Sequence, residues 1–95
     1  MDYNILVCDD ERDILDAIEI YLKAEGYSVF TAEDGVSALE ILEKKEIHLA
    51  IIDIMMPVMD GITLIMKMRE VTNIPIIVLS AKSEVTDKIV GLNVG

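Results

Sequence analysis

Cysteine and basic residues are scarce in this sequence of 95 residues. Cys8 is the only cysteine, so the chain cannot form an internal disulfide, which is consistent with a reducing compartment. Eight Lys and Arg residues stand against 18 Asp and Glu residues, for a net charge of −10. Such a chain is poorly suited to grip nucleic acid, because phosphate backbones bind patches of Lys and Arg. It is better suited to attract basic partners or divalent cations.

Long apolar runs and targeting signals are also lacking. No run approaches the ~20 apolar residues that a membrane-spanning helix needs. The N-terminal segment MDYNILVCDDERD carries neither the basic region nor the cleavage site of a secretory signal. We therefore expect a cytoplasmic protein without membrane contact, folded as a single domain over residues 1–95.

Short apolar runs alternate with stretches of helical periodicity. Solid apolar runs are typical of strands buried on both faces, and they predict strands at residues 4–8, 27–32, 47–53 and 74–81. Apolar residues three or four apart predict a helix after each strand, at residues 11–25, 36–42, 62–68 and 86–92. Gly26 is expected to end the first helix and Asp34 to cap the second. This alternation predicts an α/β fold, a doubly wound parallel sheet with helices on both faces.

Acidic residues and one hydroxyl follow the predicted strands. Asp9 and Asp10 come directly after the first strand, Asp53 ends the third and Ser80 ends the fourth. Ligands of open parallel sheets bind beyond the carboxyl ends of the strands, so these groups are expected to converge if the first and third strands are neighbours. Clustered carboxylates repel one another, and Mg²⁺, which prefers oxygen ligands, removes that conflict. No His or Cys is placed to favour zinc or a redox metal.

A carboxylate in such a cluster is a competent nucleophile for phosphoryl transfer. Attack by Asp53 would form an aspartyl-phosphate, with Mg²⁺ held by Asp9 and Asp10 offsetting the added negative charge. Ser80 and the backbone N–H of Ala81 could donate hydrogen bonds to the phosphoryl oxygens.

Each of these residues also has a plain structural interpretation. An Asp-Asp pair before a helix commonly caps it, and Asp53 and Ser80 are ordinary residues for turns. The methionines near residue 55 are ordinary packing residues. The functional interpretation depends on the coincidence of three acids and a hydroxyl at the same end of three predicted parallel strands.

Several segments resemble the response regulator receiver domains of two-component systems. They are, in order, ILVCDDE, AEDGVSALEIL, AIIDIMMPVMDG, IPIIVLSAK and DKIVGLNVG. The resemblance covers the whole chain and is to the OmpR/PhoB type, whose receivers precede a winged-helix DNA-binding domain. It implies a CheY-like, flavodoxin-like fold of three layers with strand order 2-1-3-4-5.

The resemblance also implies roles for individual residues. Asp53 would be the phosphoacceptor, and Asp9 and Asp10 would hold Mg²⁺, with Asp10 the more direct ligand. Met55 would give the metal its backbone carbonyl, and Ser80 would be the hydroxyl that turns toward the phosphoryl group.

The implied partner is a sensor histidine kinase, which docks on the first helix of receivers. The implied output is transcription regulation, with DNA contacted only by a C-terminal effector domain. Such a domain is not a classical enzyme, although it catalyses its own phosphorylation and slow dephosphorylation.

The sequence departs from the receiver pattern at its end. The family's lysine and aromatic switch residue lie on a fifth strand, and the sequence ends at Gly95 before both. We therefore expect a receiver that is incomplete at its C-terminus, without strand five and helix five. The fourth strand would then be an exposed edge, which favours self-association or domain swapping.

Two other functions are compatible with the same residues. A truncated or degenerate receiver could act only as a protein-interaction module, as the missing lysine would suggest. A phosphatase with an aspartate nucleophile is the second alternative. Fast hydrolysis of its intermediate needs a general acid two residues after the nucleophile, where Met55 has no proton to transfer.

Overall fold

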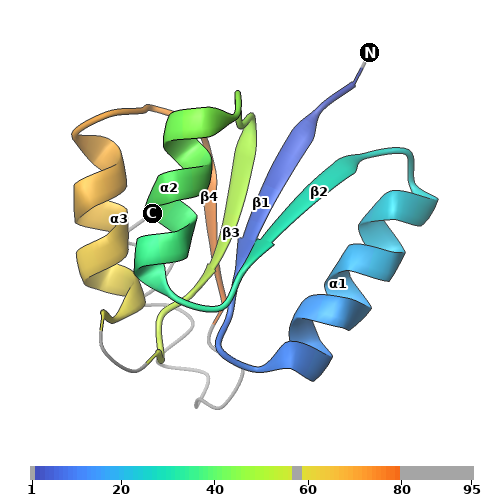
Figure 1. The fold of residues 1–95 in the computed structure, drawn as a ribbon, viewed down its shortest axis with the longest axis horizontal. Helices are drawn as coiled ribbons and strands as arrows, with labels where there is room; N and C mark the ends of the chain where they lie inside the picture. Colours follow the sequence, from blue (N-terminus) through green and yellow to red (C-terminus); the bar gives the residue numbers. More distant parts are fainter. Residues whose placement is uncertain (1, 57–58, 80–95) are drawn as a thin grey trace.

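A parallel sheet lies at the centre of the fold (Figure 1), in a computed structural model that describes residues 2–56 and 59–79. Within this part of the chain the sheet has four strands in the order β2-β1-β3-β4. The elements are β1 (Asn4–Cys8), α1 (Arg12–Ala24), β2 (Ser28–Ala32), α2 (Gly35–Lys44), β3 (Leu49–Asp53), α3 (Gly61–Arg69) and β4 (Ile76–Leu79). The predicted doubly wound sheet is therefore confirmed. Ser80, Ala81 and the helix predicted at residues 86–92 lie outside the described residues.

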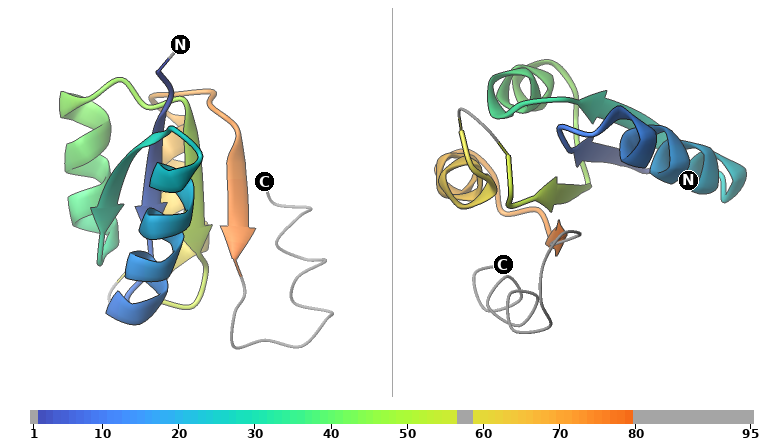
Figure 2. Two further views of the ribbon diagram at one scale, coloured as in Figure 1. Left: turned by 90° about the vertical axis from the view of Figure 1, so that its right-hand side faces the viewer. Right: turned by 90° about the horizontal axis from the view of Figure 1, so that it is seen from below.

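The sheet is covered on both faces (Figure 2): α1 packs on one face, and α2 and α3 pack on the other. Side chains alternate across β1, so Leu6 and Cys8 join the core beneath α2 and α3. Ile5 and Val7 point to the opposite face and pack with Leu15 of α1. All four of these β1 side chains are buried. Burial on both faces explains why the strand is a solid apolar run rather than an alternating one.

Local signals set the ends of the helices. The carboxylate of Asp34 accepts a hydrogen bond from the Ser37 N–H at 2.8 Å, so its predicted role as the cap of α2 is confirmed. Asp60 caps α3 in the same way, through the Thr63 N–H at 2.7 Å. These hydrogen bonds lower the pKa of both capping carboxyl groups. After α1, Gly26 adopts a φ of 96° and its N–H donates to the Lys23 carbonyl, as expected of a helix stop.

Two strands begin two residues later than their apolar runs predicted, and β2 begins one residue later, at Ser28. β3 begins at Leu49 rather than at residue 47, because the chain bends at His48 while Ile47 is buried in the core beneath α2 and α3. β4 begins at Ile76 rather than at residue 74, since Pro75 has no N–H and only its carbonyl joins the ladder, accepting from the Ala50 N–H. Apolar character therefore identified both strands but not where pairing starts.

β4 forms one edge of the described sheet, and Ile77 on this strand is 47% exposed. Self-association through this edge stays a prediction. No helix in the described part of the chain is long and apolar enough to cross a membrane.

Substitution Leu15→Ala should lower the free energy of unfolding by about 2–5 kcal/mol, because it removes a fully buried side chain and leaves a cavity between α1 and the sheet. Ile20 lies on the same helix but is 71% exposed, so Ile20→Ala should change stability by only about 0.5 kcal/mol. Urea denaturation followed by circular dichroism measures both. Equal losses in the two variants would contradict the packing of α1 described above.

Candidate functional site

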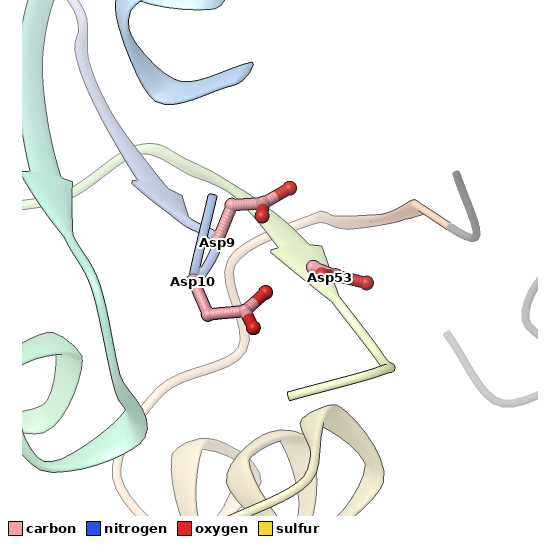
Figure 3. Close-up of side chains that lie close together, drawn as sticks. All are labelled: Asp9, Asp10 and Asp53. Carbon is pink, nitrogen blue, oxygen red and sulfur yellow. The ribbon is translucent and has the colours of Figure 1, made fainter. Parts of the chain in front are cut away.

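Three carboxylates meet at the carboxyl end of the sheet (Figure 3). Asp9 and Asp10 follow β1, and Asp53 ends β3. β1 and β3 are adjacent and parallel, and their register pairs Cys8 with Ile52. The acidic residues that follow or end these two strands therefore lie at the same level of the sheet. One oxygen from each of the three carboxylates lies within 4.8 Å of the others. The predicted convergence of Asp9, Asp10 and Asp53 is therefore what the structure contains.

Backbone hydrogen bonds orient two of these side chains. Oδ1 of Asp9 accepts from the Glu11 N–H at 2.9 Å, and Oδ1 of Asp53 accepts from the Met55 N–H at 2.9 Å. Each aspartate thus closes a short turn directly after its strand. The plain interpretation of Asp53 as a turn residue is therefore correct, and it accounts for one oxygen of its carboxylate. Asp9 was expected to cap the following helix, but the N-cap residue of α1 is Glu11, and Asp9 closes a turn before it.

Other carboxylate oxygens in the cluster are left without a partner. Oδ2 of Asp9 and Oδ1 of Asp10 are buried and have no hydrogen-bond partner among the described residues. Leaving a buried acceptor unsatisfied costs about 1–3 kcal/mol, and more when it is charged. A hard divalent cation would satisfy these oxygens and cancel the repulsion between the carboxylates. The all-oxygen donor set fits Mg²⁺ or Ca²⁺ and does not fit a thiolate or imidazole zinc site.

Burial shapes the acidity of the cluster. Asp9 is fully buried and Asp53 is 4% exposed, and burial raises the pKa of both carboxyl groups. For Asp53 the raised pKa is about 6, since the charges of Asp9 and Asp10 add to the effect of burial while the Met55 N–H opposes it. Below about pH 6, the folded protein without a cation therefore favours a protonated Asp53.

Met55 and Ser80 are the remaining predicted site residues, and the structure describes Met55 alone. Met55 follows Asp53 closely, its N–H holds the Asp53 carboxylate, and its side chain is 55% exposed at the site. The metal-binding role of its backbone carbonyl stays a prediction. Ser80 lies outside the described residues. Pro57, which follows Asp53 by four positions, also lies outside them.

At Gly61 the chain comes back against the backbone of Asp53. We call the segment between these two residues the acceptor loop. The Gly61 N–H donates to the Ile54 carbonyl at 3.2 Å. A Cβ at this position would lie 2.5 Å from the carbonyl oxygen of Asp53 and would also clash with the Cα of Ile54. Gly61 ends the receiver-like segment AIIDIMMPVMDG, and this close approach is the physical reason for a glycine there.

The Cys8 thiol, at the end of β1, makes two contacts close to the site. The Cys8 thiol donates to the Asp34 carbonyl at 3.4 Å and contacts the Met56 sulfur at 3.6 Å. Burial, reinforced by the charges of Asp34 and the nearby acids, raises the pKa of the Cys8 thiol to about 12. Cys8 is therefore an inert packing residue, as expected, that joins β1 to the acceptor loop and to the start of α2.

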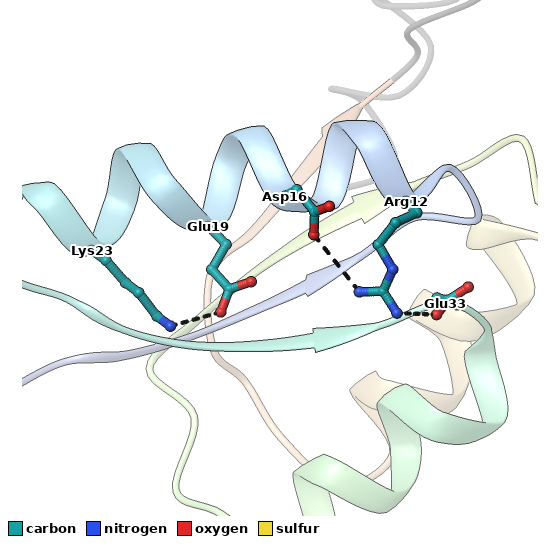
Figure 4. Close-up of polar contacts among 5 residues, drawn as sticks. All are labelled: Arg12, Asp16, Glu19, Lys23 and Glu33. Carbon is teal, nitrogen blue, oxygen red and sulfur yellow. Dashed lines mark hydrogen bonds and ion pairs between the residues drawn. The ribbon is translucent and has the colours of Figure 1, made fainter.

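Ion pairs lie along α1 (Figure 4). Arg12, in the first turn of α1, pairs with Glu33 after β2 and lies 3.8 Å from Asp16. These side chains are about half exposed, so the pairs contribute little to stability, roughly 0–1 kcal/mol each. The sequence reasoning missed both pairs. Arg12 and Glu33 lie 21 positions apart in the chain, so no local pattern indicates their contact.

Comparisons with known proteins agree on one family. A family described as "Response regulator receiver domain" matches residues 5–95. Among curated proteins, the regulatory protein VanR of Enterococcus faecium is 46% identical over 95 residues, which are all of this chain and 41% of VanR. The response regulator GtcR of Aneurinibacillus migulanus is 41% identical over the same length, 39% of that protein. The chain thus spans about two fifths of the length of these curated relatives.

Solved structures resemble this fold closely. The receiver domain of the Francisella response regulator 1452 superposes with a TM-score of 0.82 at 35% identity, covering 98% of this chain and 78% of that one. A structure of histidine kinase ThkA in complex with the response regulator protein TrrA matches with a TM-score of 0.80 at 36% identity. That match covers 87% of this chain and 72% of the other.

Without a divalent cation, stability should fall as pH rises from about 4 to 7. A carboxyl group whose pKa is raised from 3.8 to about 6 on folding favours the folded state when protonated, and this advantage is lost as pH rises through the folded pKa. The shift corresponds to about 3 kcal/mol. Asp53→Asn should reduce this pH dependence to the part that the raised pKa of Asp9 contributes, while Asp16→Asn on the exposed face of α1 should keep all of it. Urea titrations with EDTA at pH 4.5 and pH 8 test this, and an unchanged dependence in Asp53→Asn would refute it.

Gly61→Ala should destabilise the protein by about 1–3 kcal/mol, because the new Cβ meets backbone atoms that cannot move aside without shifting Asp53. Gly35→Ala is the matched control, since its Cβ would meet mainly the flexible side chain of Met59. Thermal denaturation of the two variants gives the comparison. A loss in Gly35→Ala equal to that in Gly61→Ala would argue against a special approach at Asp53.

Proposed function

This chain belongs to the response regulator receiver family, and from that membership we propose that it accepts a phosphoryl group on Asp53 from a sensor histidine kinase, with Mg²⁺ bound beside it. Receivers of this family are signalling domains of two-component systems rather than classical enzymes. The observation that carries the proposal is the meeting of Asp9, Asp10 and Asp53 at adjacent strand ends, with two buried carboxylate oxygens left unpartnered.

Asp53 is placed to act as a nucleophile. The Met55 N–H holds its Oδ1, which fixes the side chain and leaves Oδ2 as the oxygen for attack on phosphorus. In the transfer, a bond forms between this oxygen and phosphorus while the bond from phosphorus to the donor nitrogen or oxygen breaks, and the donor keeps that electron pair. Bound Mg²⁺ would supply charge neutralisation for the carboxylates and the phosphoryl oxygens.

Asp9 and Asp10 are the residues proposed to hold Mg²⁺. Their unpartnered oxygens belong to side chains with little freedom, because Asp9 is fully buried and tied to the Glu11 N–H. Asp53 and the Met55 carbonyl would complete the protein ligands. Ser80 is proposed as the hydroxyl that binds a phosphoryl oxygen after transfer.

The residue two positions after Asp53 favours a long-lived phosphorylated state. The Met55 side chain has no group that donates or accepts a proton, so it cannot act as a general acid or base for hydrolysis. Slow hydrolysis suits a signal that persists and does not suit a phosphatase. The phosphatase interpretation is therefore disfavoured by the same side chain.

The kinase partner and the output rest on the relatives. The TrrA structure is a complex with a histidine kinase, and VanR is named a regulatory protein. We propose the same kind of donor for this chain, action in the cytoplasm, and transcription regulation through a DNA-binding domain in the longer protein.

Incubation of the chain with Mg²⁺ and a small acyl phosphate should add the mass of one phosphoryl group, detected by intact mass spectrometry. Asp53→Asn should abolish the gain, because it removes the nucleophile, and EDTA should abolish it in the parent chain. Asp16→Asn is the control for the loss of one carboxylate outside the cluster. Labelling that survives in Asp53→Asn would show that another residue is the acceptor, and no labelling of the parent chain would favour a pure binding module.

A further inference from the structure

The beginning of β1 is tied to the bend that precedes β3 by three hydrogen bonds. The Asn4 N–H donates to Nδ1 of His48 at 2.9 Å, and the His48 N–H donates to the Asn4 carbonyl at 2.9 Å. The Asn4 side-chain amide donates to the Glu46 carbonyl at 2.7 Å. The His48 ring nitrogen thus accepts a hydrogen bond of the kind that a backbone carbonyl accepts within a sheet, one residue before β3 begins at Leu49.

The first of these bonds specifies the protonation state of His48. A ring nitrogen that accepts a hydrogen bond carries no proton, so the ring must be neutral with its hydrogen on Nε2. Tyr3 contacts the ring edge-on, with centroids 5.4 Å apart and planes at 85°, which holds the imidazole in this orientation. We propose that His48 is an acid-sensitive latch: its neutral ring holds the start of β1, and protonation of Nδ1 releases it.

The surroundings of His48 decide the direction of the effect. Tyr3 and Tyr27 line the cavity beside His48, together with apolar side chains of α1 and of the approach to β4, among them Leu22 and Pro75. Glu46 is a further titratable group near the ring. Glu46 is the one charged group of this set, with an oxygen 4.0 Å from Nε2. Its side chain is 86% exposed, so a pair with the imidazolium gains little. Protonation, in contrast, sets two donors against each other in a half-buried contact and removes the Asn4 bond.

Release of the latch should be local. The following residues of β1, from Ile5 to Cys8, are buried and paired with β2 on one side and β3 on the other. The acidic site at the far end of β1 stays bound by those ladders. Acid therefore opens the first residue of the strand without unfolding the sheet, as expected of a low-stability end of an element.

Amide hydrogen exchange of the intact chain, followed by NMR, tests this at the residue concerned. The protection factor of the Asn4 amide should fall on the order of tenfold between pH 8 and pH 5, the effect of losing the one hydrogen bond that a protonated ring cannot accept. The Ala50 amide, bonded to the Pro75 carbonyl, should keep its protection and serves as the internal reference. Nitrogen chemical shifts of the His48 ring at pH 8 should report the hydrogen on Nε2, and a hydrogen on Nδ1 would overturn the proposal.

His48→Asn is the matched variant, because its Oδ1 can accept from the Asn4 N–H at every pH. Its Asn4 protection should not change between pH 8 and pH 5, and a fall equal to that of the parent chain would overturn the latch. Glu46→Gln removes the carboxylate charge near Nε2 of His48, and the fall in Asn4 protection should remain. Loss of the fall in Glu46→Gln would assign the pH dependence to that carboxylate and contradict the role of Nδ1.

Discussion

Repulsion between carboxylates held together in a buried position is the constraint on which the functional end of this protein depends. Asp9, Asp10 and Asp53 are brought within a few ångströms by the pairing of β1 with β3, and burial raises the pKa of Asp9 and Asp53. A proton relieves this repulsion at low pH, since the pKa of Asp53 is about 6. At higher pH a divalent cation would relieve it by neutralising the carboxylates, which is the physical basis of the proposed Mg²⁺ site.

The rest of the fold holds that arrangement in place. Solid apolar strands pack between α1 on one face and α2 and α3 on the other, which leaves the strand ends as the place where polar groups can gather. Gly61 lets the acceptor loop close against the Asp53 backbone, and the Cys8–Met56 contact joins that loop to β1.

Sequence reasoning succeeded where a local pattern carries the information. The strands and helices followed from apolar runs and helical spacing, and Asp34 and Gly26 followed from capping chemistry. It failed where the apolar run outlasts the strand: residue 47 was assigned to β3, yet Ile47 is a core residue of the preceding bend and His48 a hydrogen-bond acceptor for Asn4. The roles of Ser80 and of the Met55 carbonyl remain predictions, derived from a family resemblance rather than from contacts.

The sequence by itself determined the fold class, the acids at the strand ends and the family, because periodicity, turn chemistry and motif spacing are properties of short segments. Only the tertiary structure decided which carboxylate oxygens are unpartnered, why the pKa of Asp53 is raised and why Gly61 admits no Cβ. It also decided that His48 accepts from Asn4, a residue 44 positions away. These properties depend on distance and burial between segments remote in the chain, which exist only once the strands have paired and water has been excluded.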